Sequence, residues 1–337
     1  MAEIKVLLVD DSSFSRDFIR TILAIDQEIV IVGEAENGKE GVEKTKELHP
    51  DLVVMDMEMP VMDGLEAVER IMCECPTPIL VIISRGGADT AFQALTKGAL
   101  EVISKTDIDP DRARQFTEQV KLLSRARVIT HVMGRNRTSN YPKEKEDDVP
   151  FENIIAIAAS TGGPNALNVI LPNFPKDFCC PIVIAQHIAE GFVVGLVEWL
   201  AKISKVAVRV AENGDHLLPG HAYVSPPDRH MVVDYGNRIA LVERKAQDIY
   251  HPSCDALLTS VASLYKTKAI GVILTGMGAD GVKGMMKIKE MRGRTIAQDQ
   301  ETSIVYGMPR QALEAGCVDI VCPLPQIGER LLSMVSG

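Results

Sequence analysis

Residues 153–164, NIIAIAASTGGP, run from an apolar segment straight into a serine, two glycines and a proline. An unbroken apolar run bounded by turn residues predicts a strand buried on both faces, as in a parallel sheet covered by helices. The glycines permit a tight turn, and a helical pattern follows over 164–171. The stretch therefore predicts a strand–loop–helix unit of an α/β fold, with Ser160 at the carboxyl end of the strand.

The first part of the chain repeats this unit. Apolar runs predict five strands, at 4–9, 29–33, 51–55, 78–83 and 101–104. Amphipathic patterns predict helices near 14–24, 38–48, 64–72, 88–98 and 110–123. Strands that are apolar on both faces and joined by helices predict a doubly wound, flavodoxin-like, five-stranded parallel sheet.

Residues 124–150 lose this periodicity and are rich in charged residues, Asn, Ser and Pro, which is typical of a linker. Beyond the linker, strands are predicted at 153–159, 181–186, 206–211, 221–226, 230–235, 239–243, 269–275 and 294–298, and helices near 164–171, 191–203, 255–265, 281–291 and 325–335. The segment 206–243 is expected to be rich in hairpins. We therefore predict a first domain over 1–123 and, over 151–337, a second α/β domain with a mainly parallel sheet and an antiparallel hairpin insert.

The composition excludes several classes of protein. The 337 residues carry a formal net charge of −10, which argues against a nucleic-acid-binding protein and suits a cytoplasmic one. No apolar run approaches the ~18 residues of a membrane span, and the first residues lack the pattern of a signal peptide. The seven cysteines form no CxxC pair, so we expect reduced, mostly structural thiols. A monomer is the default expectation.

Three carboxylates gather at one predicted edge of the first sheet. Asp10 and Asp11 follow the strand at 4–9, and Asp56 follows the strand at 51–55. With strand order 2-1-3-4-5, these two strands are neighbours at the switch point of the sheet, where ligands bind. The carboxylates would repel one another without a cation, and oxygen ligands of this kind suit Mg²⁺.

A hydroxyl and an ammonium group are predicted at the same edge, because Ser84 and Lys105 each follow a strand. Such a set can accept a phosphoryl group: Asp56 attacks in line, Mg²⁺ neutralises charge, and Lys105 and Ser84 hold the phosphoryl oxygens. Each residue alone has an ordinary structural interpretation, as a helix cap or a surface lysine. We favour the phosphoryl site because every member falls at a strand end.

Residues 1–122 resemble the receiver domain of two-component response regulators. The motifs that carry the resemblance are VDDS from residue 9, DMEMPVMDG from residue 56 and the strand-end Lys105. The resemblance implies that Asp56 is phosphorylated, that Mg²⁺ is the cofactor, and that a histidine kinase supplies the phosphoryl group. One departure is Thr106, where receiver domains usually have proline.

The loop GMGADG follows a predicted strand and opens a helix, and its glycines are Gly276, Gly278 and Gly281. With Asp299 at the end of the next strand, the spacing approaches the dinucleotide-binding fingerprint. Against this interpretation, Asp280 would face the pyrophosphate. On spacing alone, a dinucleotide loop and a plain tight turn both remain open.

Ser160 has a candidate base in His187 and a candidate orienting acid in Asp280. All three follow predicted parallel strands, so they can meet along one edge of the sheet. The glycines after Ser160 and nearby helix N–H groups would favour close approach of a substrate and an oxyanion. The alternatives are a helix N-cap for Ser160 and a hydrogen-bonded core histidine for His187. The order Ser, His, Asp, with Ala158 in place of the first glycine of G-x-S-x-G, excludes the α/β-hydrolase fold.

The second predicted domain resembles the catalytic domain of chemotaxis response-regulator protein-glutamate methylesterases, which also deamidate receptor glutamines. The matching motifs are ASTGGP, QHIAEGF, LLPGHAYVSPPDRHM, HPSCDALLTS, LTGMGADG, TIAQDQETSIVYGMP and ALEAGCVD. The resemblance implies that Ser160 is the nucleophile, His187 the base and Asp280 the orienting acid, with no cofactor in this domain. It also implies that Thr161 and Met277 line the site, Met277 near the oxyanion.

The two resemblances together imply a phosphorylation-regulated serine hydrolase. The resemblance implies that it demethylates glutamate methyl esters and deamidates glutamines on the cytoplasmic helices of chemoreceptors, for sensory adaptation in chemotaxis. The receiver is expected to restrain the hydrolase until it is phosphorylated. Two departures from the family pattern, Ala158 and Pro227, leave the triad untouched. Two other classes stay open: a phospho-switched module that binds a dinucleotide, and a receiver fused to an inactive scaffold.

Overall fold

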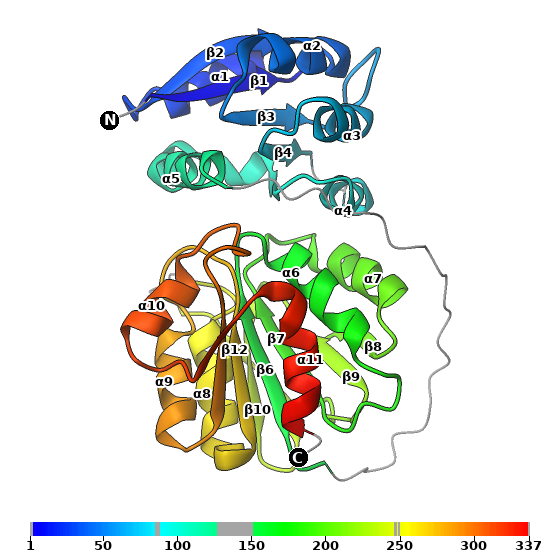
Figure 1. Cartoon of the computed structure of the whole chain (residues 1–337), viewed down its shortest axis with the longest axis vertical. Helices are drawn as coiled ribbons and strands as arrows, with labels where there is room; N and C mark the ends of the chain where they lie inside the picture. Colours follow the sequence, from blue (N-terminus) through cyan, green and yellow to red (C-terminus); the bar gives the residue numbers. More distant parts are fainter. Residues whose placement is uncertain (1–2, 85–87, 127–150, 246–247, 249, 336–337) are drawn as a thin grey trace. The chain divides into compact units, whose positions relative to one another are not determined.

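The computed structural model describes residues 3–84, 88–126, 151–245, 248 and 250–335. These residues form two compact units, each with its own parallel sheet, and each unit is described by itself (Figure 1). The predicted domain boundaries stay predictions, because residues 127–150 of the predicted linker lie outside the described residues.

The first unit is built on a five-stranded parallel sheet of order β2-β1-β3-β4-β5, which confirms the predicted fold. Its strands are β1 (Ile4–Val9), β2 (Ile29–Ala35), β3 (Leu52–Asp56), β4 (Ile79–Ile83) and β5 (Glu101–Ser104). Its helices are α1 (Ser13–Leu23), α2 (Gly38–Leu48), α3 (Gly64–Glu74), α4 (Ala88–Thr96) and α5 (Ala113–Ser124), with 3-10 turns at Lys105–Asp107 and Pro110–Arg112. Because β1 and β3 are neighbours in this order, their carboxyl ends lie side by side.

Polar side chains begin the first three helices of this unit. Ser12, Asn37 and Asp63 each accept a hydrogen bond from a backbone N–H in the first turn of α1, α2 and α3. These bonds satisfy N–H groups that have no partner within the helix. Each loop after a strand therefore passes into its helix in a fixed direction.

The second unit contains a seven-stranded sheet of order β14-β13-β12-β6-β7-β9-β8, in which every neighbouring pair is parallel. Its strands are β6 (Ile154–Ala159), β7 (Ile182–Gln186), β8 (Ala207–Val210), β9 (His221–Val224), β12 (Ala269–Ile273), β13 (Arg294–Gln298) and β14 (Ile320–Cys322). A separate antiparallel pair consists of β10 (Arg229–Asp234) and β11 (Arg238–Glu243). The predicted parallel sheet with a hairpin insert is confirmed.

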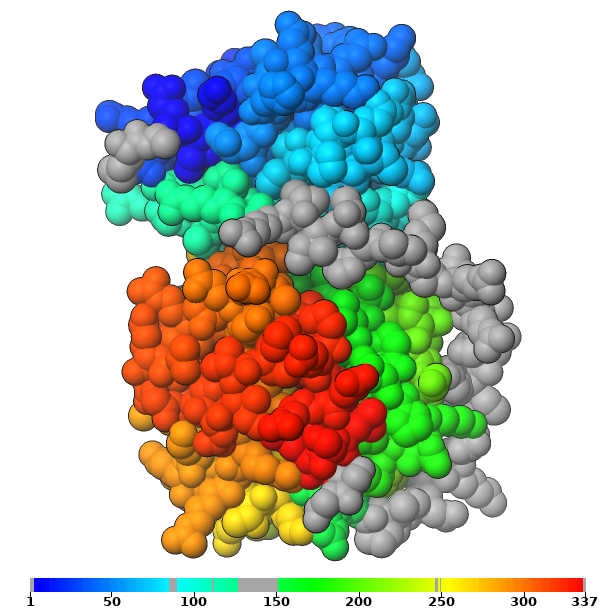
Figure 2. All heavy atoms as spheres, viewed as in Figure 1, coloured from blue at the N-terminus to red at the C-terminus, as the bar shows by residue number. Residues whose placement is uncertain are grey.

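Helices cover both faces of this sheet (Figure 1). The helices α6 (Gly163–Ile170), α7 (Val193–Ile203) and α11 (Leu324–Val335) lie on one face, and α8 (Cys254–Tyr265), α9 (Val282–Glu290) and α10 (Met308–Glu314) lie on the other. Short 3-10 turns occupy Leu171–Asn173 and Lys266–Lys268. The hairpin packs against α8, while α11, coloured red, lies on the surface of its unit (Figure 2).

Three local features differ from the sequence prediction. The segment 206–243 is predicted to be rich in hairpins, but within it β8 and β9 pair in parallel at the edge of the main sheet. The alternating pattern of a strand does not reveal whether its neighbour runs parallel or antiparallel to it. That direction depends on how the connecting segment 211–220 returns the chain to the sheet. Helix α10 and strand β14 were not predicted, because both are short and their apolar patterns are weak.

Two expectations from the composition concern the state of the cysteines and the presence of membrane spans. All seven cysteines are free, as expected from their spacing. Among the described residues, no helix combines the length and the apolar character that a membrane span requires.

Candidate functional site

Three neighbouring strands of the second sheet bring the predicted serine, histidine and aspartate together. Ser160 follows β6, His187 follows β7, and Asp280 lies in the loop that joins β12 to α9. In the sheet, β7 lies on one side of β6 and β12 lies on the other. The loops that follow these three strands therefore meet at a switch point of the sheet. The backbone N–H of Ser160 donates to the carbonyl of Thr275, which ties two of these loops directly.

The three side chains form a continuous hydrogen-bonded row. Nδ1 of His187 lies 3.2 Å from Oγ of Ser160, and Nε2 of His187 lies 2.8 Å from Oδ2 of Asp280. A carboxylate only accepts hydrogen bonds, so Nε2 carries the proton and Nδ1 is left to accept the serine hydroxyl. The imidazole is therefore held in the tautomer that a general base needs, with Nδ1 facing the hydroxyl of Ser160.

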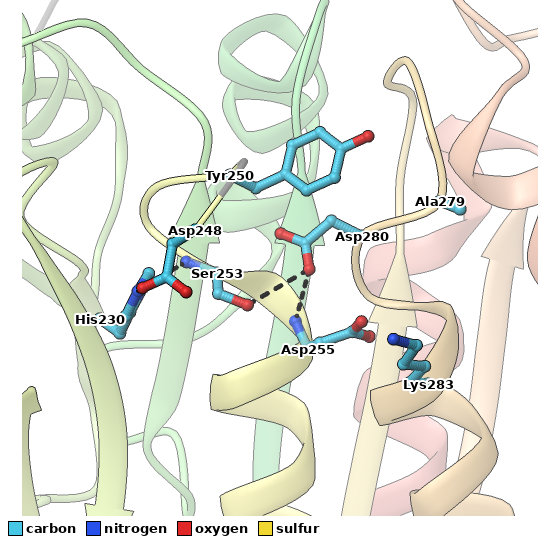
Figure 3. Close-up of a pocket in the computed structure, with 8 residues that line it drawn as sticks. All are labelled: His230, Asp248, Tyr250, Ser253, Asp255, Ala279, Asp280 and Lys283. Carbon is cyan, nitrogen blue, oxygen red and sulfur yellow. Dashed lines mark hydrogen bonds and ion pairs between the residues drawn. The ribbon is translucent and has the colours of Figure 1, made fainter. Parts of the chain in front are cut away.

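Asp280 is fixed by more than its histidine. Its carboxylate also accepts hydrogen bonds from the backbone N–H groups of Cys254 (2.7 Å) and Asp255 (2.9 Å), at the start of α8. The hydroxyl of Ser253 lies 3.3 Å from the same carboxylate (Figure 3). Burial alone would raise the pKa of Asp280, but the hydrogen bonds from His187 and the two N–H groups hold it below its usual value. Asp280 is therefore a buried anion at neutral pH.

Asp280 accepts hydrogen bonds from the start of helix α8, and Asp255, in the first turn of α8, does the same at the start of helix α9. Its Oδ1 accepts hydrogen bonds from the backbone N–H groups of Gly281 and Gly284, each at 2.9 Å. A dinucleotide bound to the GMGADG loop would need these N–H groups for its pyrophosphate. Because Asp255 occupies them and Asp280 faces His187, the geometry does not favour the dinucleotide interpretation. Asp299, the acidic residue of the dinucleotide-binding fingerprint, is also engaged within the protein, because its carboxylate accepts hydrogen bonds from Thr302.

Gln186 is a site residue that the sequence analysis missed. Its Nε2 donates to the carbonyl oxygens of Ser160 (2.9 Å) and His187 (2.8 Å), so one side chain braces the backbones of both residues. Its Oε1 lies against Gly163, where any Cβ would overlap it. The oxygen is buried and has no partner among the described residues. The sequence could have indicated this role, because Gln186 is the last residue of its strand and directly precedes His187.

The remaining sequence-predicted residues lie around the triad. Gly276 packs so closely that a Cβ on it would lie 2.6 Å from Cβ of Ser160, and Met277 is the next residue in the chain. The carbonyl of Thr161 accepts a hydrogen bond from the hydroxyl of Thr275 at 2.9 Å. Ala158 is fully buried in β6, with its methyl group directed at Gly281. The alanine is therefore accommodated by packing rather than by a change in the turn.

A buried thiol also lies near the histidine. Sγ of Cys254 is 3.5 Å from Nε2 of His187 and donates to the carbonyl of Ala185. Complete burial raises the pKa of Cys254 well above that of a free thiol. A neutral, buried thiol is a poor nucleophile, so the hydroxyl of Ser160 is the candidate nucleophile of this row.

A cleft of about 320 Å³ opens beside Asp280 (Figure 3). Tyr250, Ala279 and Lys283 line it, together with a second histidine–aspartate pair. In that pair Nε2 of His230 lies 2.8 Å from Asp248, and Nδ1 of His230 accepts the backbone N–H of Ser253 at 3.0 Å. No role was assigned to His230, Asp248 or Tyr250 from the sequence.

The first unit brings its carboxylates together as well. Ligand atoms of Asp10, Asp11 and Asp56 all lie within 4.8 Å of one another. Asp10 and Asp56 are buried, Asp11 is exposed, and Nζ of Lys105 lies 3.0 Å from both buried carboxylates. Burial and the neighbouring Asp10 raise the pKa of Asp56 to about 6, although Lys105 opposes the rise. A site that crowds anions in this way fits a hard divalent cation.

Lys105 contacts this cluster of carboxylates, and Ser84 follows β4, the strand that pairs with the one carrying Asp56. Burial alone would lower the pKa of Lys105, but Asp56 and Asp10 hold it above its usual value. Ser84 directly follows β4 and is partly buried. Thr106, the departure from the receiver pattern, shares a hydrogen bond of 2.8 Å with the hydroxyl of Ser104.

Comparison with known proteins relates both units to described families. Residues 155–331 match the CheB methylesterase family, and residues 6–117 match the response regulator receiver domain. The protein-glutamate methylesterase/protein-glutamine glutaminase 3 of Paramagnetospirillum magneticum is 42% identical over 99% of this chain and 97% of its own length. A protein of the same name, numbered 1, from Syntrophus aciditrophicus is 40% identical over 99% of both chains. The crystal structure of the Thermotoga maritima CheB methylesterase catalytic domain is 40% identical over 56% of this chain and 100% of its own, with a TM-score of 0.54.

Proposed function

The chain belongs to the CheB methylesterase family and carries an N-terminal receiver domain. On this premise we propose which residue performs each step of the reaction. Its activity is that of a protein-glutamate methylesterase/protein-glutamine glutaminase. The observation that carries the proposal is the row of hydrogen bonds from Ser160 through His187 to Asp280. The substrates are methylated glutamates and glutamines on the cytoplasmic helices of chemoreceptors, which sets the site of action in the cytoplasm.

The first half-reaction forms an acyl-enzyme. Oγ of Ser160 attacks the γ-carbonyl carbon of the substrate, and its proton passes to Nδ1 of His187. Asp280 accepts the hydrogen bond from Nε2 and stabilises the imidazolium. The tetrahedral intermediate collapses, the bond to the methoxy group breaks, and His187 returns the proton so that methanol leaves. A glutamine follows the same path and releases ammonia.

The second half-reaction restores the serine. His187 takes a proton from a water molecule that attacks the acyl carbon, and then protonates Oγ of Ser160 as the glutamate leaves. The backbone near Thr161 and Met277 lines the position of the oxyanion. Helix α6 begins directly beyond Ser160, so its N-terminal dipole favours the negative charge that develops there.

The receiver unit accepts a phosphoryl group on Asp56 from a histidine kinase. Asp10, Asp11 and Asp56 would hold Mg²⁺, which supplies charge neutralisation for the phosphoryl oxygens when bound. Asp56 attacks phosphorus in line and becomes an acyl phosphate as the donor's leaving group departs. Lys105 and Ser84 hold the transferred oxygens. The phosphorylated receiver raises the activity of the hydrolase, and the chain acts as a monomer.

Methanol release tests both halves of the proposal. The substrate is a methylated chemoreceptor cytoplasmic fragment, and the reaction is run with and without Mg²⁺ and a small phosphodonor. We expect release that rises with the phosphodonor in the wild type, persists at the basal level in Asp56→Asn, and disappears in Ser160→Ala. Release that survives in Ser160→Ala would refute the assignment of the nucleophile.

A further inference from the structure

The imidazole of the triad has an aromatic ring on its face. The ring of Tyr250 stacks on that of His187 with a centroid distance of 5.2 Å and an angle of 7° between the planes. The same tyrosine reaches the GMGADG loop, because a Cβ on Gly278 would lie 2.6 Å from its hydroxyl oxygen. Tyr250 is 37% exposed, so one side of the residue faces solvent. It therefore spans from the base to the loop beside the oxyanion position.

We propose that Tyr250 is a positioning residue, which holds the imidazole of His187 in the plane of the triad and stabilises its protonated form during catalysis. The inference rests on the proposed function, since it assigns Tyr250 a part in the reaction of Ser160. It names a residue that neither the sequence motifs nor the hydrogen-bonded row identifies.

The geometry leaves the ring face as the place for such a contact. Both nitrogens of His187 are already engaged in the ring plane, one with Ser160 and the other with Asp280. A further neighbour can act only above or below that plane. The face of an aromatic ring is electronegative, so a parallel ring attracts an imidazolium more strongly than a neutral imidazole. Because His187 becomes charged as Ser160 attacks, the contact is strongest in the transition state.

The segment that carries Tyr250 is anchored on both sides in the sequence. Before it, Asp248 accepts hydrogen bonds from Nε2 of His230 (2.8 Å) and from the backbone N–H of Lys245 (2.7 Å). After it, the backbone N–H of Ser253 donates to Nδ1 of the same His230 (3.0 Å). His230 is buried, so one fixed side chain ties both flanks of the tyrosine (Figure 3). The ring is thereby placed by the fold, independently of any contact that it makes with His187.

The predicted size of the effect follows from the contact. A ring over a cation contributes an amount that corresponds to a change of about 2- to 30-fold in rate. The change should fall on kcat, because the imidazolium is absent from the ground state. A tyrosine that only covered the site, or that bound substrate through its hydroxyl, would instead change KM or respond to loss of the hydroxyl.

Two substitutions in the full chain separate these roles. Tyr250→Phe keeps the ring and loses the hydroxyl, and Tyr250→Leu keeps apolar bulk and loses the ring. Tyr235→Leu is the matched control, since Tyr235 is 84% exposed in the turn of the β10–β11 hairpin. Each variant is measured with Mg²⁺ and phosphodonor on the methylated receptor fragment. The rate of Ser160 modification by phenylmethanesulfonyl fluoride, followed by intact mass, is measured in parallel.

We expect kcat and the rate of Ser160 modification to fall about 2- to 30-fold together in Tyr250→Leu, with KM unchanged within about twofold. Tyr250→Phe and Tyr235→Leu should match the wild type. Equal rates in Tyr250→Leu and wild type, or equal losses in Tyr250→Phe and Tyr250→Leu, would overturn the inference while leaving the triad intact. A wild-type protein whose Ser160 neither turns over the receptor fragment nor reacts with the sulfonyl fluoride would overturn the proposed function itself. Unchanged thermal unfolding of the variants excludes a loss of fold as the cause.

Discussion

Replacing Asp56 with asparagine should stabilise the first unit when Mg²⁺ is withheld. Asp56 is 4% exposed and lies beside the second buried carboxylate, Asp10. Burial and this neighbour raise its pKa from 3.8 to about 6. The fold therefore disfavours the carboxylate relative to the neutral acid, and asparagine has nearly the same shape as that neutral acid. The pKa of about 6 already includes the attraction of Lys105, which partly compensates for the burial of the carboxylate.

The magnitude follows from linkage between proton binding and folding. A pKa of about 6 in the folded protein against 3.8 in the unfolded chain corresponds to about 3 kcal/mol of unfolding free energy lost above pH 6. Between these two values the folded protein binds the proton that the unfolded chain has released, so stability falls as pH rises through this window. Asp56→Asn should thus gain up to about 3 kcal/mol at pH 7.5 and little near pH 4.

Amide hydrogen exchange in EDTA measures this effect in the full chain. Peptides from β3 and β4 report the opening of the first unit. Fluorescence of Trp199, the single tryptophan of the chain, reports the second unit and should not change. Asp11→Asn serves as the control, because Asp11 is exposed and its carboxylate stays hydrated. Adding Mg²⁺ should slow exchange in the wild type far more than in Asp56→Asn. Faster exchange in Asp56→Asn than in wild type at pH 7.5 in EDTA would refute the reasoning.

Three further outcomes can be measured on the second unit. Asp280→Asn should lower kcat for methanol release by about 10³- to 10⁴-fold, because the amide no longer selects the tautomer of His187; a loss below tenfold would contradict this role. Gly163→Ala should lower the free energy of unfolding seen by tryptophan fluorescence by about 1–3 kcal/mol, because the new methyl group overlaps the buried amide oxygen of Gln186; an unchanged midpoint would show that the loop adapts. Deleting residues 1–145 should raise the basal rate of methanol release above that of the unphosphorylated full chain, and a rate that stayed equal would exclude restraint by the receiver.

The fold was largely predictable because its signals are local. Buried strands appear as apolar runs, helices as amphipathic patterns, and the turns between them as glycine and polar residues. The candidate residues were found for the same reason, since Ser160, His187, Asp56 and Lys105 each follow a strand. In a parallel sheet the carboxyl ends of the strands share one edge, so a local position already implies a common site.

The sequence by itself determined the class of fold, the strand ends and the residue types gathered there, because these depend on neighbours within a few residues. Only the tertiary structure decided which strands of the second sheet are adjacent, and hence that β8 and β9 run parallel and that β12 lies beside β6. It alone decided that Asp255 occupies the N–H groups of the GMGADG loop, that Gln186 braces Ser160 and His187, and that Tyr250 covers the imidazole. Apart from the hydrogen bond of Gln186 to its neighbour His187, each of these contacts joins segments far apart in the chain. Such contacts follow from how complete elements pack together, and no pattern of neighbouring residues encodes them.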